Sequence, residues 1–99
     1  PEPWYIRVMR KLERVLKGLA NRRRLAIVKL LMGERDLAVG DIAAAIRLSE
    51  KSTSKHLRIL THVGALEHDQ KSRYMFYRIA NGPDSTLAKL FAIIAHSRE

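Results

Sequence analysis

The stretch that decides the fold is residues 48–64, LSEKSTSKHLRILTHVG. Its apolar residues recur at helical spacing, so one side of a helix here can pack on a core; they are Leu57, Leu60 and Val63, with Ile59 beside them. The opposite side carries short hydroxyl groups and long cations, namely Lys51, Ser52, Ser54, Lys55 and Arg58. Because such side chains donate hydrogen bonds to phosphates and base edges, the pattern predicts a helix that offers its polar face to a nucleic acid.

The segments around this helix complete an ordered unit over residues 37–79. It consists of a brief helix over 40–46, a turn over 47–49, the second helix, and strands over 65–69 and 73–79 joined by a turn at 70–72. Ser49 is placed to cap the second helix, and Gly64 is placed to end it. A tight turn between helices often uses Gly at positive φ, so Arg47 would carry about 1 kcal/mol of strain there. Two helices, a tight turn and a β-hairpin are the elements of a winged helix-turn-helix, whose second helix enters the major groove.

The rest of the chain supplies the other helices of one domain. Hydrophobic periodicity predicts helices over 4–19 and 22–32, a short strand over 37–39, and a last helix that begins at Asp84 or Ser85. Asn21 is a suitable cap for the second of these helices, and Gly33 a suitable stop. We therefore expect residues 1–99 to form a single domain, mainly α with a small β-hairpin: about five helices and a two-stranded wing.

The first and last helices carry long apolar stripes. A three-helix core is expected to be too small to cover both, and an exposed stripe of this size marks an interface. Because two-fold symmetry is the commonest closed solution, we expect a homodimer built from these two helices. The residues expected in the dimer interface are Tyr5, Met9, Leu12, Leu16, Leu87, Leu90, Phe91 and Ile94.

The expected partner is double-stranded DNA with a palindromic operator. The residues expected to contact it are Glu50, Lys51, Ser52, Ser54, Lys55 and Arg58 on the second helix of the unit, and Lys71 and Arg73 near the hairpin tip. Lys51 can donate to guanine, whereas Arg58, Lys71 and Arg73 suit phosphates or the minor groove. Glu50 would be repelled by a polyanion, so it either accepts from cytosine N4 or only stabilises the start of its helix.

The charge of the chain agrees with a polyanionic partner but lies partly elsewhere. The net charge is +9, and residues 1–33 hold nine Lys and Arg against two Glu. These N-terminal charges either contact flanking phosphates or form a solvated helix face. Arg22, Arg23 and Arg24 oppose the dipole of the helix that they begin, which a bound anion would relieve; exposed arginines screened by salt are the alternative.

Several classes of protein are excluded or disfavoured. The chain contains no cysteine, so disulfides and thiol chemistry are excluded. The histidines, His56, His62, His68 and His96, lack a nucleophile and carboxylate arranged as a triad, so we expect no enzyme and no cofactor.

The expected location is the cytoplasm. No apolar run approaches the length of a membrane span, and basic residues interrupt the N-terminal segment where a signal peptide needs an apolar run; they are Arg7, Arg10, Lys11 and Arg14. The chain begins at Pro1 rather than Met, so residues before it are expected.

Two other binding functions compete with duplex DNA. Winged helices also serve as protein–protein interaction modules, but such a module does not need five cations on one surface. RNA binding would need an aromatic platform for stacking, and Tyr74 and Phe76 are the only clustered candidates. DNA binding therefore remains the preferred hypothesis.

The order of motifs resembles one known family. Residues 19–25 (LANRRRL), 48–57, 63–66 (VGAL) and 73–79 (RYMFYRI) together resemble the ArsR/SmtB family of winged-helix repressors. The resemblance implies a homodimer held by the first and last helices, and operator binding through the second helix of the unit and the wing. It also implies release by an inducer, often a metal.

The metal ligands of that family are where the chain departs from it. The family's metal sensors commonly carry cysteines where this chain has residues 37–41, LAVGD. A second family site uses carboxylates and histidines on the last helix, of which His96 and Glu99 match half; Pro83 and Ser85 stand where the other half should lie. Two ligands do not complete a tetrahedral zinc site. We therefore expect no metal site, and the inducer stays unidentified.

Overall fold

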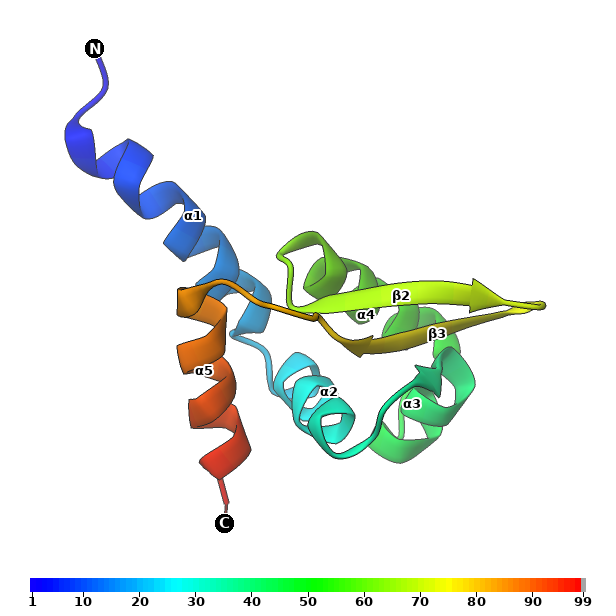
Figure 1. Cartoon of the computed structure of the whole chain (residues 1–99). Helices are drawn as coiled ribbons and strands as arrows, with labels where there is room; N and C mark the ends of the chain where they lie inside the picture. The colour runs from blue at the N-terminus through cyan, green and yellow to red at the C-terminus, as the bar shows by residue number, and fades with distance from the viewer. Residues whose placement is uncertain (99) are drawn as a thin grey trace.

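The computed structural model describes residues 1–98 and shows a winged helix-turn-helix, as the sequence predicted (Figure 1). In chain order its elements are α1 (Trp4–Leu19), α2 (Arg22–Gly33), β1 (Leu37–Ala38), α3 (Val39–Ile46), α4 (Glu50–His62), β2 (Leu66–Lys71), β3 (Tyr74–Ile79) and α5 (Ser85–His96). The strands form one antiparallel sheet in the order β1-β3-β2, so the short strand expected over 37–39 does join the hairpin.

Three helices begin where a side chain satisfies their free amide groups. The Asn21 carboxamide oxygen accepts from Arg23 N and Arg24 N at 3.0 and 3.1 Å, which confirms it as the cap of α2. Ser49 Oγ accepts from Ser52 N at 3.1 Å and so caps α4. Asp84 Oδ1 accepts from Leu87 N at 3.0 Å, which starts α5 at the position expected.

The turn between α3 and α4 has the strained conformation that the sequence suggested. Arg47 has φ 56° and ψ 53°, in the left-handed region, and its amide donates to the carbonyl of Ala44 at 3.3 Å. Gly64, just after α4, has φ 85° and ends that helix as a glycine can without strain.

The hairpin turn begins later than predicted. The strands continue to Lys71 and resume at Tyr74, which face each other, so the turn consists of Ser72 and Arg73 rather than residues 70–72. The polar side chain of Gln70 indicated a loop, but Gln70 pairs with Met75 inside the ladder. Only the first turn residue, Ser72, has positive φ, at 60°.

The core lies between α2, α3, α4 and the inner face of the sheet. Ile27, Val28, Ile42, Leu57 and Leu60 are completely buried there.

The stripe on α5 corrects one of our expectations. Leu87, Phe91 and Ile94 are 3%, 7% and 7% exposed and belong to the core cluster, because α5 packs against α2. The expectation that a single chain leaves this stripe uncovered is therefore wrong. Of the four residues predicted on α5, Leu90 alone is half-buried, and the other three are buried.

The stripe on α1 is uncovered, as expected. The first half of α1 projects away from the rest of the molecule (Figure 1). Large apolar side chains on this helix remain between 37% and 71% exposed: Trp4, Tyr5, Val8, Met9, Leu12 and Leu16. Ile93 on α5 is 64% exposed. None of the helices within residues 1–98 is long and apolar enough to cross a membrane.

Candidate nucleic-acid interface

Helix α4 has one buried side and one cationic side. Thr53, Leu57 and Leu60 are 0% exposed and turn toward the core. Lys51, Lys55 and Arg58 are exposed and stand four and three residues apart, so they form one stripe along the helix. Within residues 1–98 none of these three cations pairs with a carboxylate. Their charges are therefore available to an external anion.

The two serines of the predicted set lie beside this stripe. Ser52 and Ser54 are half-buried, and the backbone amide of Ser52 is already held by the Ser49 cap. Thr53 between them is completely buried, and its hydroxyl has no hydrogen-bond partner within residues 1–98. Sequence reasoning did not single out Thr53, whose one signal is its place four residues before Leu57 on the apolar side.

Glu50 lies against the start of α3. A Cβ placed on Gly40 would be 3.5 Å from Glu50 Oε2. Helix α3 has Ala38 at its N-cap position, without a side chain to satisfy its first amides. A carboxylate at this place complements the positive end of α3 as well as that of α4. The position of Glu50 therefore favours helix stabilisation over cytosine recognition.

The two wing cations lie in different surroundings. Arg73 stands in the hairpin turn and, with Glu50, Asp41 and Tyr74, lines a groove between the wing and the start of α3. Lys71 is the last residue of β2, and its ammonium group is 3.5 Å from Asp36 Oδ2 and 5.5 Å from the centre of the Phe76 ring. Arg73 is thus the wing cation that has no intramolecular carboxylate partner within residues 1–98.

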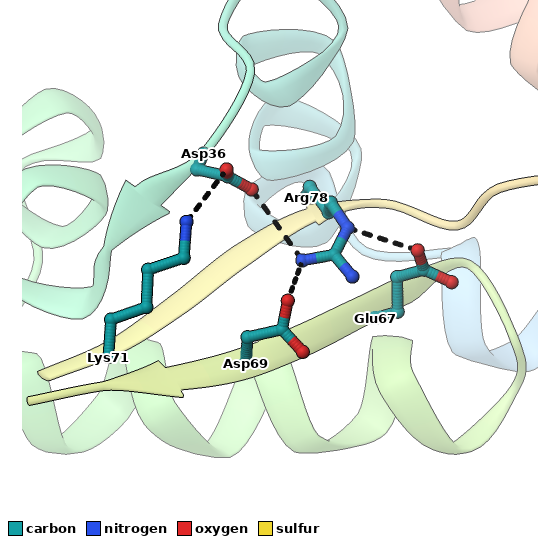
Figure 2. A network of polar contacts seen from close by, with 5 residues as sticks. All are labelled: Asp36, Glu67, Asp69, Lys71 and Arg78. Atoms are coloured by element: carbon teal, nitrogen blue, oxygen red, sulfur yellow. Dashed lines mark hydrogen bonds and ion pairs between the residues drawn. The ribbon is translucent and has the colours of Figure 1, made fainter.

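Arg78 of β3 contacts two carboxylates of β2 and a third, Asp36, just before β1 (Figure 2). Its Nε lies 3.0 Å from Glu67 Oε1 and its Nη1 2.8 Å from Asp69 Oδ2, while Asp36 Oδ1 is 3.7 Å from the same Nη1. Hydrogen bonds to Asp69 and Glu67 raise the pKa of Arg78 above its ordinary value. Sequence reasoning missed this network, because only the correct turn at Ser72 and Arg73 places Glu67 opposite Arg78.

Arg24 differs from Arg22 and Arg23 because its guanidinium group already has partners within the protein. Its guanidinium group donates to the carbonyls of Gly18 and Lys17, which belong to the last turn of α1, and lies 3.2 Å from His56 Nδ1 on α4. Arg22 and Arg23 are exposed and Arg24 is half-buried, so the phosphate hypothesis is weaker for Arg24 than for its two neighbours. Burial and the charges of Arg24 and Arg23 hold the pKa of His56 below its ordinary value of 6.5.

The described part of the chain contains no cluster of three or more His, Cys, Asp or Glu that could hold a metal ion. His96 is exposed at the end of α5, and Glu99, its partner in the H-x-x-E pair, lies outside the described residues.

Residues 21–67, which span α2 to the start of β2, match the profile of a protein family described as "Bacterial regulatory protein, arsR family". An HTH-type transcriptional regulator from Mycobacterium tuberculosis is 43% identical over 82% of this chain and 34% of its own length. The transcriptional repressor SdpR of Bacillus subtilis is 32% identical over 66% of this chain and 71% of its own length. Several curated relatives are longer proteins, of whose length the chain spans between 34% and 61%.

A solved structure extends the similarity to nearly the whole fold. It is a homodimeric winged helix-turn-helix DNA-binding domain from Mycobacterium bovis, a possible ArsR-family transcriptional regulator. The two share 32% identity over 95% of this chain and 83% of that one, with a TM-score of 0.77. The chain belongs to the arsR family of bacterial regulatory proteins.

Proposed function

We propose that this chain is a sequence-specific, double-stranded DNA-binding regulator of transcription that acts as a homodimer. The observation that carries the proposal is the stripe of Lys51, Lys55 and Arg58 on α4. It runs along the exposed side of a helix whose other side is fixed in the core. A rigid cationic helix of this kind can enter the major groove without losing its own packing.

Within the stripe we assign base recognition to the first turns of α4. Lys51 lies there with Ser52 and Ser54, and in helix-turn-helix proteins this part of the second helix meets the base edges. Lys51 can donate to guanine O6 and N7, and serine hydroxyls can contact either bases or phosphates. Lys55 and Arg58, farther along α4, are assigned to phosphates together with Arg73 of the wing. Lys71 would also contact a phosphate once its ammonium group separates from Asp36.

The homodimer follows from the uncovered stripe on α1. A single chain leaves Trp4, Tyr5, Val8, Met9, Leu12 and Leu16 in solvent. Burying them against a second copy stabilises the assembly at about 25 cal/mol per Å² of apolar surface. A two-fold axis beside α1 and α5 would repeat α4 about 34 Å away, which is one turn of B-DNA, so the operator should be palindromic.

Repression is the simplest outcome of such binding, because a dimer that covers its operator excludes the polymerase. The related SdpR is named a repressor. A regulator of this kind would work in the cytoplasm, where bacterial DNA lies. The family's metal inducers are not carried over to this chain, which lacks their cysteines.

The test measures affinity for an operator selected from random duplexes, over a range of salt concentrations. Lys51→Ala should weaken operator binding by about 1–3 kcal/mol and relax one base position. Arg73→Ala should weaken all duplexes alike and lower the salt slope by roughly one. Arg35→Ala removes an exposed cation from the α2–β1 loop and is the matched control, with affinity close to that of the wild type.

Three outcomes would contradict the proposal. Equal operator affinity of the wild type, Lys51→Ala and Arg73→Ala would mean that α4 and the wing are not the DNA-binding surface. Preference for duplex RNA at the same salt would indicate an RNA-binding protein. Absence of binding to either nucleic acid would leave the protein–protein interaction module as the function.

A further inference from the structure

The contacts of Arg24 connect three helices that are distant in the sequence. Its Nε and Nη2 donate to the carbonyls of Gly18 and Lys17, groups that have no partner within the end of α1. Its Nη1 lies 3.2 Å from His56 Nδ1, in the middle of α4. One guanidinium group on α2 therefore ties the end of α1 to the helix that carries the cationic stripe.

We propose that Arg24 and His56 are a positioning pair for DNA binding, in which Arg24 fixes the orientation of α4 relative to α1 through the neutral imidazole of His56. The inference rests on the proposed function, since it concerns the orientation in which α4 enters the major groove of DNA. Neither residue needs to touch DNA for this role. Helix α1 carries the exposed stripe proposed for the dimer, so its angle to α4 would set the distance between the two recognition helices.

The chemistry of the contact fixes the state of the histidine. A guanidinium group has only N–H donors, so His56 Nδ1 must accept the hydrogen bond. The ring is then neutral and carries its proton on Nε2. A second proton on Nδ1 would remove the acceptor and place two cations at hydrogen-bond distance. Protonation of His56 therefore breaks the tie between α4 and the end of α1.

No charged group found near His56 within residues 1–98 would compensate this loss. Helix α2 presents Arg24 and Arg23, which both disfavour the charged ring, and the α1 carbonyls of Gly18 and Lys17 already accept from Arg24. On its own helix the neighbouring charged residue is Lys55. No carboxylate within residues 1–98 pairs with His56. The folded state thus favours neutral His56. The contribution of the neutral ring to the stability of the folded state is complete above pH 6.5 and is lost as the pH falls below that value.

A second contact shows that the tie lies at a tight junction. A Cβ placed on Gly18 would lie 2.9 Å from Val63 Cγ1, so the end of α1 touches the end of α4 as well. Gly18 therefore meets α4 directly through Val63 and indirectly through Arg24 and His56. When the hydrogen bond between Arg24 and His56 breaks, Val63 remains the direct contact between α4 and the end of α1, so the angle between these two helices is less constrained.

The test compares operator affinity between about pH 8 and pH 5.5 for the wild type, His56→Gln and His62→Gln. Glutamine can accept from Arg24 through its carbonyl oxygen but does not titrate, whereas His62 is an exposed histidine on the same helix and serves as the control. We expect the wild type to lose affinity relative to His56→Gln as the pH falls to about 5.5, by less than about tenfold. Tenfold is the limit set by a histidine with the ordinary pKa of 6.5, and the lowered pKa of His56 keeps more of its ring neutral at that pH. His62→Gln should follow the wild type.

Two further measurements keep the test independent of how well one variant folds. The ring nitrogen shifts of His56 in the wild type at about pH 8 should show a proton on Nε2 and an accepting Nδ1. When Arg24→Gln is added to the wild type and to His56→Gln, the pH profiles of the two resulting proteins should coincide, because the guanidinium group that ties α4 to α1 is gone from both.

The outcomes separate this inference from the proposed function. Parallel pH profiles of the wild type and His56→Gln, or a proton on Nδ1 at about pH 8, would overturn the inference while DNA binding itself stands. Absence of DNA binding at about pH 8 in every variant would overturn the proposed function and the inference together.

Discussion

Replacing Gly18 with alanine should separate α1 from α4. Gly18 is buried at the end of α1, and a Cβ built there would stand 2.9 and 3.1 Å from the two methyl groups of Val63. Both distances are shorter than ordinary contacts between carbon atoms, which lie at about 3.5–4.0 Å. Rotating Val63 about χ1 would still leave one methyl group pointing at the new atom, so the helices themselves must move apart.

The magnitude follows from two opposing effects. Alanine in place of glycine within a helix stabilises it by roughly 1 kcal/mol. Overpacking a close contact between elements costs about 1–3 kcal/mol. Because the cost of overpacking exceeds the gain in helix propensity, we expect Gly18→Ala to lower the free energy of unfolding by about 1 kcal/mol, within a range of about 0–2 kcal/mol. Gly33→Ala, at the end of α2, has no atom within 4 Å of its Cβ and should be neutral or slightly stabilising.

Urea unfolding followed by circular dichroism, at one fixed protein concentration, measures both variants. A double-mutant cycle identifies the cause, since Val63→Ala removes the two methyl groups that the new Cβ would meet. In that background Gly18→Ala should become stabilising, which corresponds to a coupling energy of about 1 kcal/mol or more. The reasoning is refuted if Gly18→Ala stabilises the protein as much as Gly33→Ala does, or if the effect is the same with and without Val63.

Two further predictions concern assembly and metals. Replacing Val8 and Leu12 with Glu should give folded monomers, as measured by light scattering, because both side chains are exposed on α1. Phe91→Glu should instead unfold the protein, because Phe91 is in the core. A wild type that is monomeric at micromolar concentration would contradict the proposed dimer. Operator binding should be unchanged by stoichiometric zinc, cadmium, copper or arsenite, since the chain has no thiolate; calorimetry that shows sub-micromolar zinc binding, lost in His96→Ala, would contradict this.

Local patterns in the sequence were enough to predict most of the elements. Helix α1 begins and ends at the residues expected from its periodicity, and Asn21 and Ser49 cap the helices that they were expected to cap. Arg47 has the positive φ that its place in a tight turn suggested. These features depend on spacing, caps and backbone preferences within a few residues, which a sequence displays directly.

Features that depend on packing between distant segments could not be predicted in the same way. The apolar stripe of α5 has the same spacing whether it meets α2 or a second chain, so Phe91 was expected at a surface that it does not occupy. Arg24 has the same sequence context as Arg22 and Arg23, and only the fold brings its side chain to Lys17, Gly18 and His56. The cationic stripe of α4 was predictable because it lies on one helix, whereas its role as a DNA-contact surface stays a prediction.

The network around Arg78 gives the wing two unlike faces. The β2 residues Glu67, Asp69 and Lys71 pair with β3 residues, so their side chains share the outer face of the sheet with Arg78 (Figure 2). With Asp36 this face holds three carboxylates against two cations, Arg78 and Lys71, so its net charge is negative and its two cations are already paired with carboxylates. The hairpin should therefore approach a duplex only tip first, with Arg73 leading. Carboxylates that contact no base would in this way weaken binding to sequences other than the operator. Selectivity for the operator would then depend partly on residues that repel DNA.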